Sequence, residues 1–323
     1  MPNITSSTFE SPFWLPNGHF QSIFPSLFRK VKGITYQRER ITTPDADFLD
    51  LDWAVVDKSK NLVIISHGLE GDSHRQYMTG MVKYFNQNDY NCLAWNFRSC
   101  SGEMNLQSRF YHSGATDDLN IVVNYAISKG FETISLIGFS LGGNLTIKYL
   151  GENPEALPKV INKAVVFSVP LHLSSSSDKM ATWQDWIYDQ RFRRSLLKKV
   201  IEKAEKMPEK IDISKISQIK NLRDFDDQFT SILHGFKDAE DYYQQNSSLF
   251  FLEKITVPTL IINAQNDPFL SPACFPVKQL ENHKSIYLEI PATGGHCGFY
   301  QKDFQGVLWS EKRAVEFIGL GRK

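Results

Sequence analysis

Residues 133–150 read TISLIGFSLGGNLTIKYL, and this stretch decides the fold class. Its first part, Thr133 to Gly138, is a short apolar run of the kind that forms a buried strand. Its last part, Leu141 to Leu150, is long enough and apolar enough to form a packed helix. A strand that turns directly into a helix is the building unit of an α/β protein with a parallel sheet.

A serine stands at the turn between this strand and this helix. Residues 138–142 (GFSLG) form a G-x-S-x-G motif, which in such a context puts its serine on a sharp, strained turn above the sheet. The positions around it must be very small, and Gly138, Gly142 and Gly143 leave that space. The positive end of the following helix lies beside the hydroxyl. The pattern predicts Ser140 as a nucleophile, and a glycine-rich turn with an unreactive serine is the alternative.

The alternation of strand and helix continues on both sides of this stretch. One helical run carries Met78, Met81 and Phe85 on a single face. We therefore expect an α/β fold with a mostly parallel central sheet and helices on both faces. The other predicted parallel strands are Asn61–Ser66, Cys92–Asn96, Ala164–Val169, Thr259–Ala264 and Ile286–Ile290, and the predicted antiparallel edge strands are Ile34–Thr42 and Phe48–Val56.

One segment, between Pro170 and about Thr256, interrupts this alternation. It is helical, charged and aromatic, without a strand-like run. Because both flanking runs look like strands of one sheet, we interpret it as an inserted helical cap rather than a separate domain. An insertion there would lie above the carboxyl ends of the strands, where ligands bind in open α/β folds. The predicted parts are an N-terminal arm at 1–29, a core at 30–170 and 257–323, and a cap at 171–256, all within one domain spanning 1–323.

A nucleophilic serine needs a base, and the base needs an acid that orients it. Asp267 follows the predicted strand TLIINA, and His296 follows the predicted strand SIYLEI within a glycine-rich loop. The chain order is then Ser140, Asp267, His296, which is the order typical of the G-x-S-x-G elbow. Taken singly, Asp267 could be a turn residue before proline and His296 a loop residue. Taken with Ser140, they predict a catalytic triad.

An oxyanion formed at the serine needs two main-chain N–H donors. We expect one from Leu141, directly after the nucleophile, and the other from Leu69, in the loop HGLEG at 67–71. His67 begins that loop, and we interpret it as a stabilising residue rather than a catalytic one.

Three other residues could have a chemical role. Asp226 and Asp227 in the cap could bind a substrate amine, but we favour a structural or solvent-facing use. Cys297 adjoins His296 without a base of its own, so we interpret it as a packing residue. We find no metal-ligand cluster, phosphate loop or dinucleotide motif, and we expect no cofactor and no metal.

The bulk properties exclude several classes of protein. The formal net charge over 323 residues is zero, which argues against nucleic acid as the main partner. Four cysteines with no disulfide or zinc spacing, and a start without a basic and apolar leader, favour a cytoplasmic location. No apolar run reaches about 18 residues, so we expect no transmembrane segment.

The aromatic stretch from Phe13 to Phe28 could touch a membrane. We favour packing on the core, because Pro16 and Pro25 would break a long amphipathic helix.

The sequence resembles the YheT-like branch of the α/β-hydrolases, which includes medium-chain fatty acid ethyl ester synthase/esterases and related phospholipases. The resemblance implies a triad at Ser140, Asp267 and His296, and small-molecule acyl ester or thioester substrates. Where the family usually has a glycine after Arg98, this chain has Ser99. The resemblance covers almost the whole chain and rests on NGHFQ (17–21), HGLEG (67–71), NFRSCSGE (96–103), GFSLGGN (138–144), FDDQFT (225–230), HGFKDAEDYY (234–243), NDPF (266–269) and GGHCGF (294–299).

These observations together predict a serine carboxylester hydrolase for short- to medium-chain acyl esters, acting through an acyl-enzyme. Three alternatives stay open: an acyltransferase that makes esters from acyl donors and alcohols, an aminopeptidase, and a non-catalytic binding protein on the same scaffold. The sequence does not predict the acyl length, the alcohol or the oligomeric state.

Overall fold

Nine strands form one sheet in the computed structural model, which describes residues 3–4, 7–56 and 59–320. The strand order is β1-β9-β8-β7-β6-β4-β5-β3-β2, and only β3 runs against its neighbours. The α/β fold with a mostly parallel sheet is therefore confirmed. The strands are β1 (Asn3–Ile4), β2 (Gln37–Thr42), β3 (Phe48–Ala54), β4 (Asn61–Ser66), β5 (Asn91–Asn96), β6 (Thr133–Phe139), β7 (Ile161–Phe167), β8 (Thr259–Ile262) and β9 (Ile286–Glu289).

Helices cover both faces of the sheet, and each face has its own hydrophobic cluster. In β4, Leu62 and Ile64 pack with α3 (Thr116–Ser128) and α4 (Leu141–Glu152), whereas Val63 and Ile65 pack with α2 (Gln76–Asn86) and α11 (Trp309–Gly319). This is the side-chain alternation of a strand buried on both sides. The face of α2 predicted to be apolar is fully buried, with Met78, Met81 and Phe85 all at 0% exposure.

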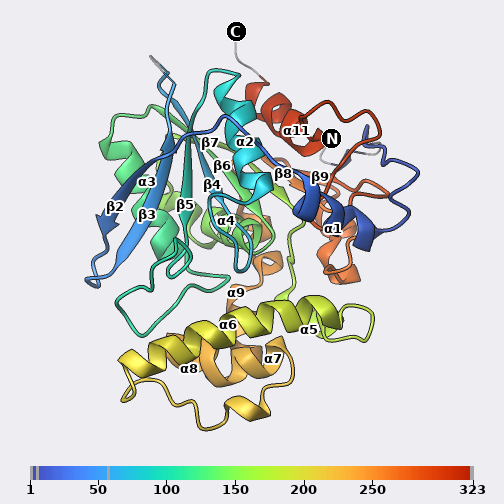
Figure 1. Ribbon diagram of the computed structural model, residues 1–323. Coiled ribbons are helices and arrows are strands. Elements are labelled where there is room, and N and C mark those ends of the chain that lie inside the picture. The colour runs from blue at the N-terminus through green and yellow to red at the C-terminus, as the bar shows by residue number, and fades with distance from the viewer. Residues whose placement is uncertain (1–2, 5–6, 57–58, 321–323) are drawn as a thin grey trace.

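The chain between β7 and β8 forms a separate layer of helices below the carboxyl ends of the strands (Figure 1). Its interior includes Val200, Phe225 and Phe229. The helical elements of this layer are α5 (Leu173–Met180), α6 (Trp186–Lys206), α7 (Leu222–Phe225), the π-helix η3 (Asp226–Thr230), α8 (Ser231–His234), α9 (Ala239–Asn246) and short 3₁₀ turns at Ile216–Gln218 and Ser248–Lys254. The core has further short helical turns at Pro154–Ala156, Pro272–Cys274 and α10 (Val277–Leu280).

The N-terminal stretch packs on the core, but through a helix that continues past a proline. Helix α1 (Gly18–Phe28) contains Pro25, so our expectation that this proline would break the helix was wrong. Pro25 removes only one internal N–H, and Arg29 N–H still donates to Pro25 O at 3.1 Å. Arg29 then anchors the end of the helix through a buried ion pair with Glu311 of α11 at 2.7 Å. Residues 1–2 and 5–6 of the predicted arm lie outside the described residues.

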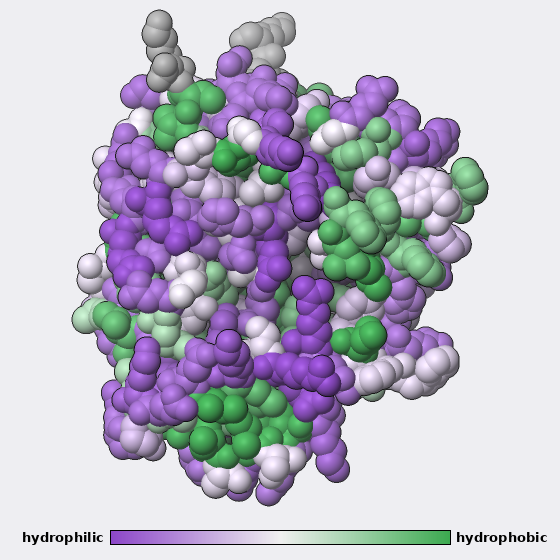
Figure 2. Space-filling view, viewed as in Figure 1, coloured by the Kyte–Doolittle hydropathy of each residue, from purple (hydrophilic) through white to green (hydrophobic). Residues whose placement is uncertain are grey.

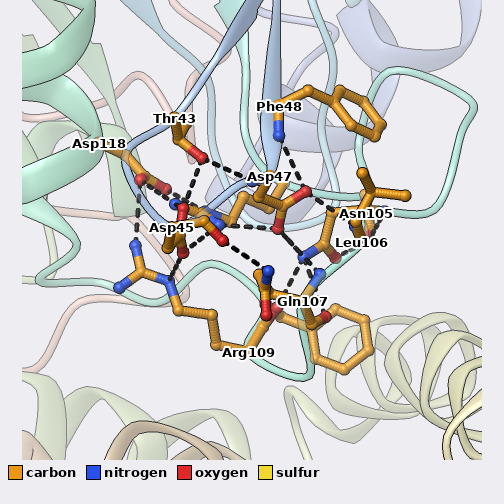
Figure 3. A network of polar contacts seen from close by, with 12 residues as sticks. Thr43, Asp45, Asp47, Phe48, Asn105, Leu106, Gln107, Arg109 and Asp118 are labelled. Carbon is orange, nitrogen blue, oxygen red and sulfur yellow. Dashed lines mark hydrogen bonds and ion pairs between the residues drawn. The ribbon is translucent and has the colours of Figure 1, made fainter.

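A buried polar network gathers in the loops beside β3 and β5 (Figure 3) and extends to Lys203 of the helical layer between β7 and β8. Arg98 is 2% exposed, and its guanidinium donates to Asp118 at 2.7 and 2.8 Å, and to Asp47 at 2.7 Å. Asn105 links Asp47 to Lys203 of α6, a lysine whose pKa burial lowers to about 7. The network thereby fastens the long cap helix to the loops beside β3 and β5.

Candidate active site

Ser140 lies between the end of β6 and the start of α4 in a strained backbone conformation. Its φ is 53° and its ψ is −118°, values that residues other than glycine rarely adopt. The turn is possible because its neighbours lack a Cβ atom. A Cβ at Gly142 would overlap the main-chain oxygens of Ser66 and His67, and one at Gly138 would overlap Gly142 O. The glycines of the motif are therefore steric requirements of the turn.

Ser140, His296 and Asp267 form one continuous chain of hydrogen bonds. The Ser140 Oγ lies 2.9 Å from His296 Nε2, and His296 Nδ1 lies 2.9 and 3.0 Å from the two Asp267 oxygens. The Asp267 side chain is 0% exposed, and it also accepts from Phe269 N–H at 2.9 Å. The structure thus brings together three side chains that lie far apart in the sequence, with a hydroxyl, an imidazole and a carboxylate in the order that activates a serine.

The electrostatics favour a basic imidazole. Burial disfavours the charged form of His296, but the Asp267 carboxylate outweighs this effect and raises the pKa of His296 to about 10. Once the ring is neutral, the same contact fixes its tautomer, because Nδ1–H donates to the carboxylate and Nε2 can accept the serine proton.

The loop that carries His296 is held by helix α1. His296 N–H donates to Ser22 Oγ at 2.7 Å, and Gly294 N–H donates to Gln21 Oε1 at 2.7 Å. Asn266, next to Asp267, also donates to Gln21 Oε1 at 3.0 Å. We did not predict this role for Gln21 and Ser22. The available signal was the presence of NGHFQ among the motifs of the resemblance, which named the segment without giving its contacts.

The loop after β4 passes directly beside the serine. A Cβ at Gly68 would lie 3.2 Å from Ser140 Cβ, and Gly71 N–H donates to Gly68 O at 3.0 Å, which closes a tight turn. Leu69 within this turn and Leu141 at the start of α4 line the same cavity as Ser140 and His296. Both residues predicted to supply oxyanion donors therefore line the cavity onto which Ser140 opens.

Glu70, the residue after Leu69, connects this turn to the cap. Its backbone has a φ of 52°, and its N–H donates to the Tyr111 oxygen at 2.9 Å. Its carboxylate accepts from Tyr111 OH at 2.8 Å, from Lys199 Nζ at 2.8 Å and from Ser195 Oγ. Because Ser195 and Lys199 belong to α6, one buried carboxylate joins α6 to the turn of Leu69.

His67 stabilises the loop after β4 through both of its ring nitrogens. It is 0% exposed, accepts from Phe97 N–H at 3.1 Å through Nε2 and pairs through Nδ1 with Gly68 O at 2.7 Å. Burial lowers its pKa to about 4, so it stays neutral at physiological pH. These contacts support the interpretation of His67 as a loop-stabilising residue.

Ser140 and His296 open onto a cavity whose walls come largely from the layer between β7 and β8. Its apolar lining includes Met180, Phe192, Leu196, Val200, Phe225 and Phe229. Three other large side chains of that segment do not line the cavity, because Trp183, Trp186 and Ile187 face solvent.

The remaining candidates have structural contacts. The carboxylate of Asp226 borders the cavity and accepts from Thr230 Oγ1 at 2.6 Å and Tyr243 OH at 2.7 Å, while burial raises its pKa to about 6. Asp227 accepts from Ala239 N–H at 3.1 Å. Cys297 is buried in the cluster between the sheet and α2. Within the described residues, no group of three or more His, Cys, Asp or Glu side chains is arranged to hold a metal ion.

Comparison with known proteins identifies the family of the chain. The sequence model of the alpha/beta hydrolase fold family matches residues 61–303, a span that runs from β4 past His296. The chain belongs to the α/β-hydrolase family. Within this family, the resemblance to the YheT branch is confirmed: the chain is 32% identical over 312 residues to the putative esterase YheT of Escherichia coli K12, covering 94% of this chain and 90% of that protein.

Other relatives are less similar in sequence. The chain is 27% identical over 309 residues to the phospholipase ABHD3 of Mus musculus, covering 92% of this chain and 74% of that protein. Among solved structures, the Pyrococcus furiosus esterase Pf2001 superposes with a TM-score of 0.59 at 18% identity, covering 97% of this chain and 98% of that one. The family and the fold support a hydrolase. Among the described helices, none combines the length and apolar character needed to cross a bilayer.

Proposed function

We propose that this protein is a serine carboxylester hydrolase that acts on short- to medium-chain acyl esters. The observation that carries the proposal is the chain of hydrogen bonds from Ser140 through His296 to Asp267 at the base of an apolar cavity. The names of the relatives, an esterase and a phospholipase, point to the same ester chemistry. In this proposal Ser140 is the nucleophile, His296 the general base and Asp267 the orienting acid.

The proposed reaction has two steps. His296 Nε2 takes the Ser140 proton while Oγ bonds to the ester carbonyl carbon, and the N–H groups of Leu69 and Leu141 hold the oxyanion, each worth about 3 kcal/mol. The intermediate collapses, and the leaving alkoxide takes the proton from His296. Water then attacks the acyl-enzyme with His296 again as base, which releases the carboxylic acid and restores the serine.

We further propose that residues 171–256 act as a cap on a single domain spanning 1–323, and that this cap sets the acyl preference. Each methylene of an acyl chain buried against residues such as Phe192 and Leu196 contributes about 0.8 kcal/mol. The kcat/KM should therefore rise with chain length and fall once the chain meets the end of the cavity.

The test combines a nucleophile variant with a substrate series. Ser140→Ala should retain the fold but lose hydrolysis of p-nitrophenyl esters and labelling by a fluorophosphonate. The wild type should show a maximum of kcat/KM at short to medium acyl chains. A variant that keeps substantial turnover would remove Ser140 from its role, and a flat profile from acetate to decanoate would remove the cap from its role.

A further inference from the structure

Two segments beside the candidate active site carry more than half of the large hydrophobic side chains that are exposed in the described part of the chain. Of the 17 large hydrophobic side chains that are exposed in the described part of the chain, nine lie within residues 11–32 and 181–194. We call these nine side chains the mouth surface. Six come from α1 and its approach: Phe13, Trp14, Phe20, Ile23, Leu27 and Phe28. Three come from the turn before α6 and its start: Trp183, Trp186 and Ile187.

The two segments lie side by side and form one surface. The rings of His19 and Tyr188 stack at 5.8 Å, and His19 Nδ1 lies 3.2 Å from Tyr188 OH. Figure 2 shows hydrophobic side chains gathered over the position of α1 on this face of the molecule. The mouth surface therefore spans the junction between the core and the cap layer.

This junction is also where a cleft opens from solvent to the serine. Ile23 and Leu27 of α1 line the cleft together with Arg191 of α6, and Ser140 and His296 lie in the same cleft. Two members of the mouth surface are thus at once exposed and part of the route toward the nucleophile.

Helix α1 turns apolar side chains outward, which is unusual for a helix that faces only water. Its buried positions are Gly18, Gln21 and Pro25, whereas its outward positions include Phe20 and Leu27. A surface helix of a soluble protein normally turns its polar side outward. The outward apolar side of α1 therefore calls for an apolar partner.

The exposed charges within the two segments are of one sign. Residues 11–32 contain no acidic residue, and both acidic residues of 181–194, Asp185 and Asp189, are buried. The exposed charged side chains of the two segments are Lys30, Lys32, Arg191 and Arg194. A second copy of this chain would bring these cations against one another and would close the cleft.

We propose that the mouth surface docks on a lipid bilayer that carries anionic headgroups. Tryptophan and phenylalanine side chains enter the boundary between headgroups and acyl chains, and the flanking cations pair with the negative surface. Docking in this orientation turns the cleft toward the bilayer, so that an acyl ester can pass from the lipid to Ser140. The proposal rests on the proposed function only for this direction of substrate entry, and lipid binding itself does not depend on hydrolysis.

The experiment measures co-sedimentation of the full chain with phosphatidylcholine vesicles, with and without phosphatidylglycerol. All proteins carry Ser140→Ala, so that binding is read without turnover. The apolar variant F13S/F20S/W183S removes three mouth-surface side chains that lie outside the cleft lining, and K32E/R194E reverses two of the cations. The matched control V55S/L106S removes two exposed hydrophobic side chains from other parts of the surface.

The protein and its control should sediment with the anionic vesicles and much less with the neutral ones. The apolar variant should lose affinity by about tenfold or more, and each reversed cation should lower the affinity at least about fivefold. In the Ser140-containing background, the apolar variant should still hydrolyse a short, water-soluble ester at the wild-type rate, which checks its fold. Failure of the wild type to sediment, or normal sedimentation of the apolar variant, would overturn the proposal. A dimer in light scattering that the apolar variant dissociates would instead assign the surface to a second copy.

Discussion

At the scale of single residues, the candidate site depends on a carboxylate that no solvent reaches. Asp267 contacts His296 with both oxygens, and its charge is the largest of the effects that raise the pKa of that imidazole, to which Cys297 also contributes. Since a general base works in its unprotonated form, this pKa determines the pH at which activity appears. The charge of Asp267 therefore affects both the rate and its pH dependence.

Asp267→Asn should lower kcat by about ten-thousandfold, as in other Ser-His-Asp triads. Wild-type kcat/KM should rise as the pH increases through the raised pKa of His296, because the base then loses its proton. The variant lacks the negative charge, so its rise should occur at lower pH. Rates with a fluorogenic ester across the pH range measure both effects, with exposed Asp303→Asn as control. An unshifted profile would mean that another group sets the pKa.

Ser22 gives a second prediction at this scale. Its hydroxyl accepts from His296 N–H and donates to Gly18 O at 2.6 Å, so it fixes the position of the histidine loop relative to α1. Ser22→Ala should lower kcat by about tenfold with a smaller change in KM, because a small displacement of the base weakens proton transfer. Ser128→Ala, at another serine that bonds its own helix, should leave kcat unchanged. Equal KM and kcat effects would argue against a positioning role.

At the scale of elements, the cap helix and the turn of Leu69 depend on each other. The Glu70 side chain is 7% exposed, and it contacts α6 through Lys199 and Ser195. The residue that precedes it supplies the proposed oxyanion donor. A change in this contact should therefore reach the reaction through the backbone of the turn, without touching the substrate.

Glu70→Gln keeps the shape but removes the charge that holds Lys199. We expect kcat to fall between about tenfold and about a hundredfold, since the Leu69 N–H moves from its position. The matched control is Glu202→Gln, which breaks an exposed pair with Lys198 on the same helix and should change little. Steady-state kinetics on one ester compare the two variants. A normal kcat in Glu70→Gln would separate the cap from the oxyanion turn.

The elements differ in how far the sequence predicts them. The bounds of β4 match the prediction, because a short apolar run that ends at His67-Gly68 leaves a strand little freedom. Local patterns also predicted Ser140, Asp267 and His296, since each follows a strand in the expected order. Helix α1 was harder to predict from the sequence, because its continuation past Pro25 depends on contacts with residues far along the chain. The outward position of Trp183 and Trp186 likewise depends on packing that no local pattern encodes.

At the scale of the whole molecule, the network around Asp45, Asp47 and Asp118 connects three separate parts of the chain (Figure 3). Arg98 neutralises these carboxylates from the loop after β5, and the Arg98 and Asp118 side chains are each 1% exposed. Buried charges of this kind depend strongly on each other, because a single unpaired one costs several kcal/mol.

Arg98→Met should lower the free energy of unfolding by about 3–5 kcal/mol, because it removes the guanidinium from the buried Asp47 carboxylate and leaves Asp118 with only its contact to Arg109 at 3.1 Å. Urea denaturation followed by circular dichroism measures this change. Arg194→Met provides the control, since Arg194 is exposed and, among the described residues, forms a side-chain hydrogen bond only with Gln190 of its own helix. A loss below about 1 kcal/mol would show that water or rearrangement compensates the two carboxylates.

The contact between Ser22 and His296 also has a consequence for biosynthesis. The two residues are 274 positions apart, so one is made early and the other late as the ribosome reads the message. Ser140 is made before the histidine loop exists, so a growing chain of that length cannot yet complete the proposed reactive centre. The N-terminal arm forms this contact only after the histidine loop has been made and docks on it. The proposed reactive centre is therefore complete only after translation has passed residue 296.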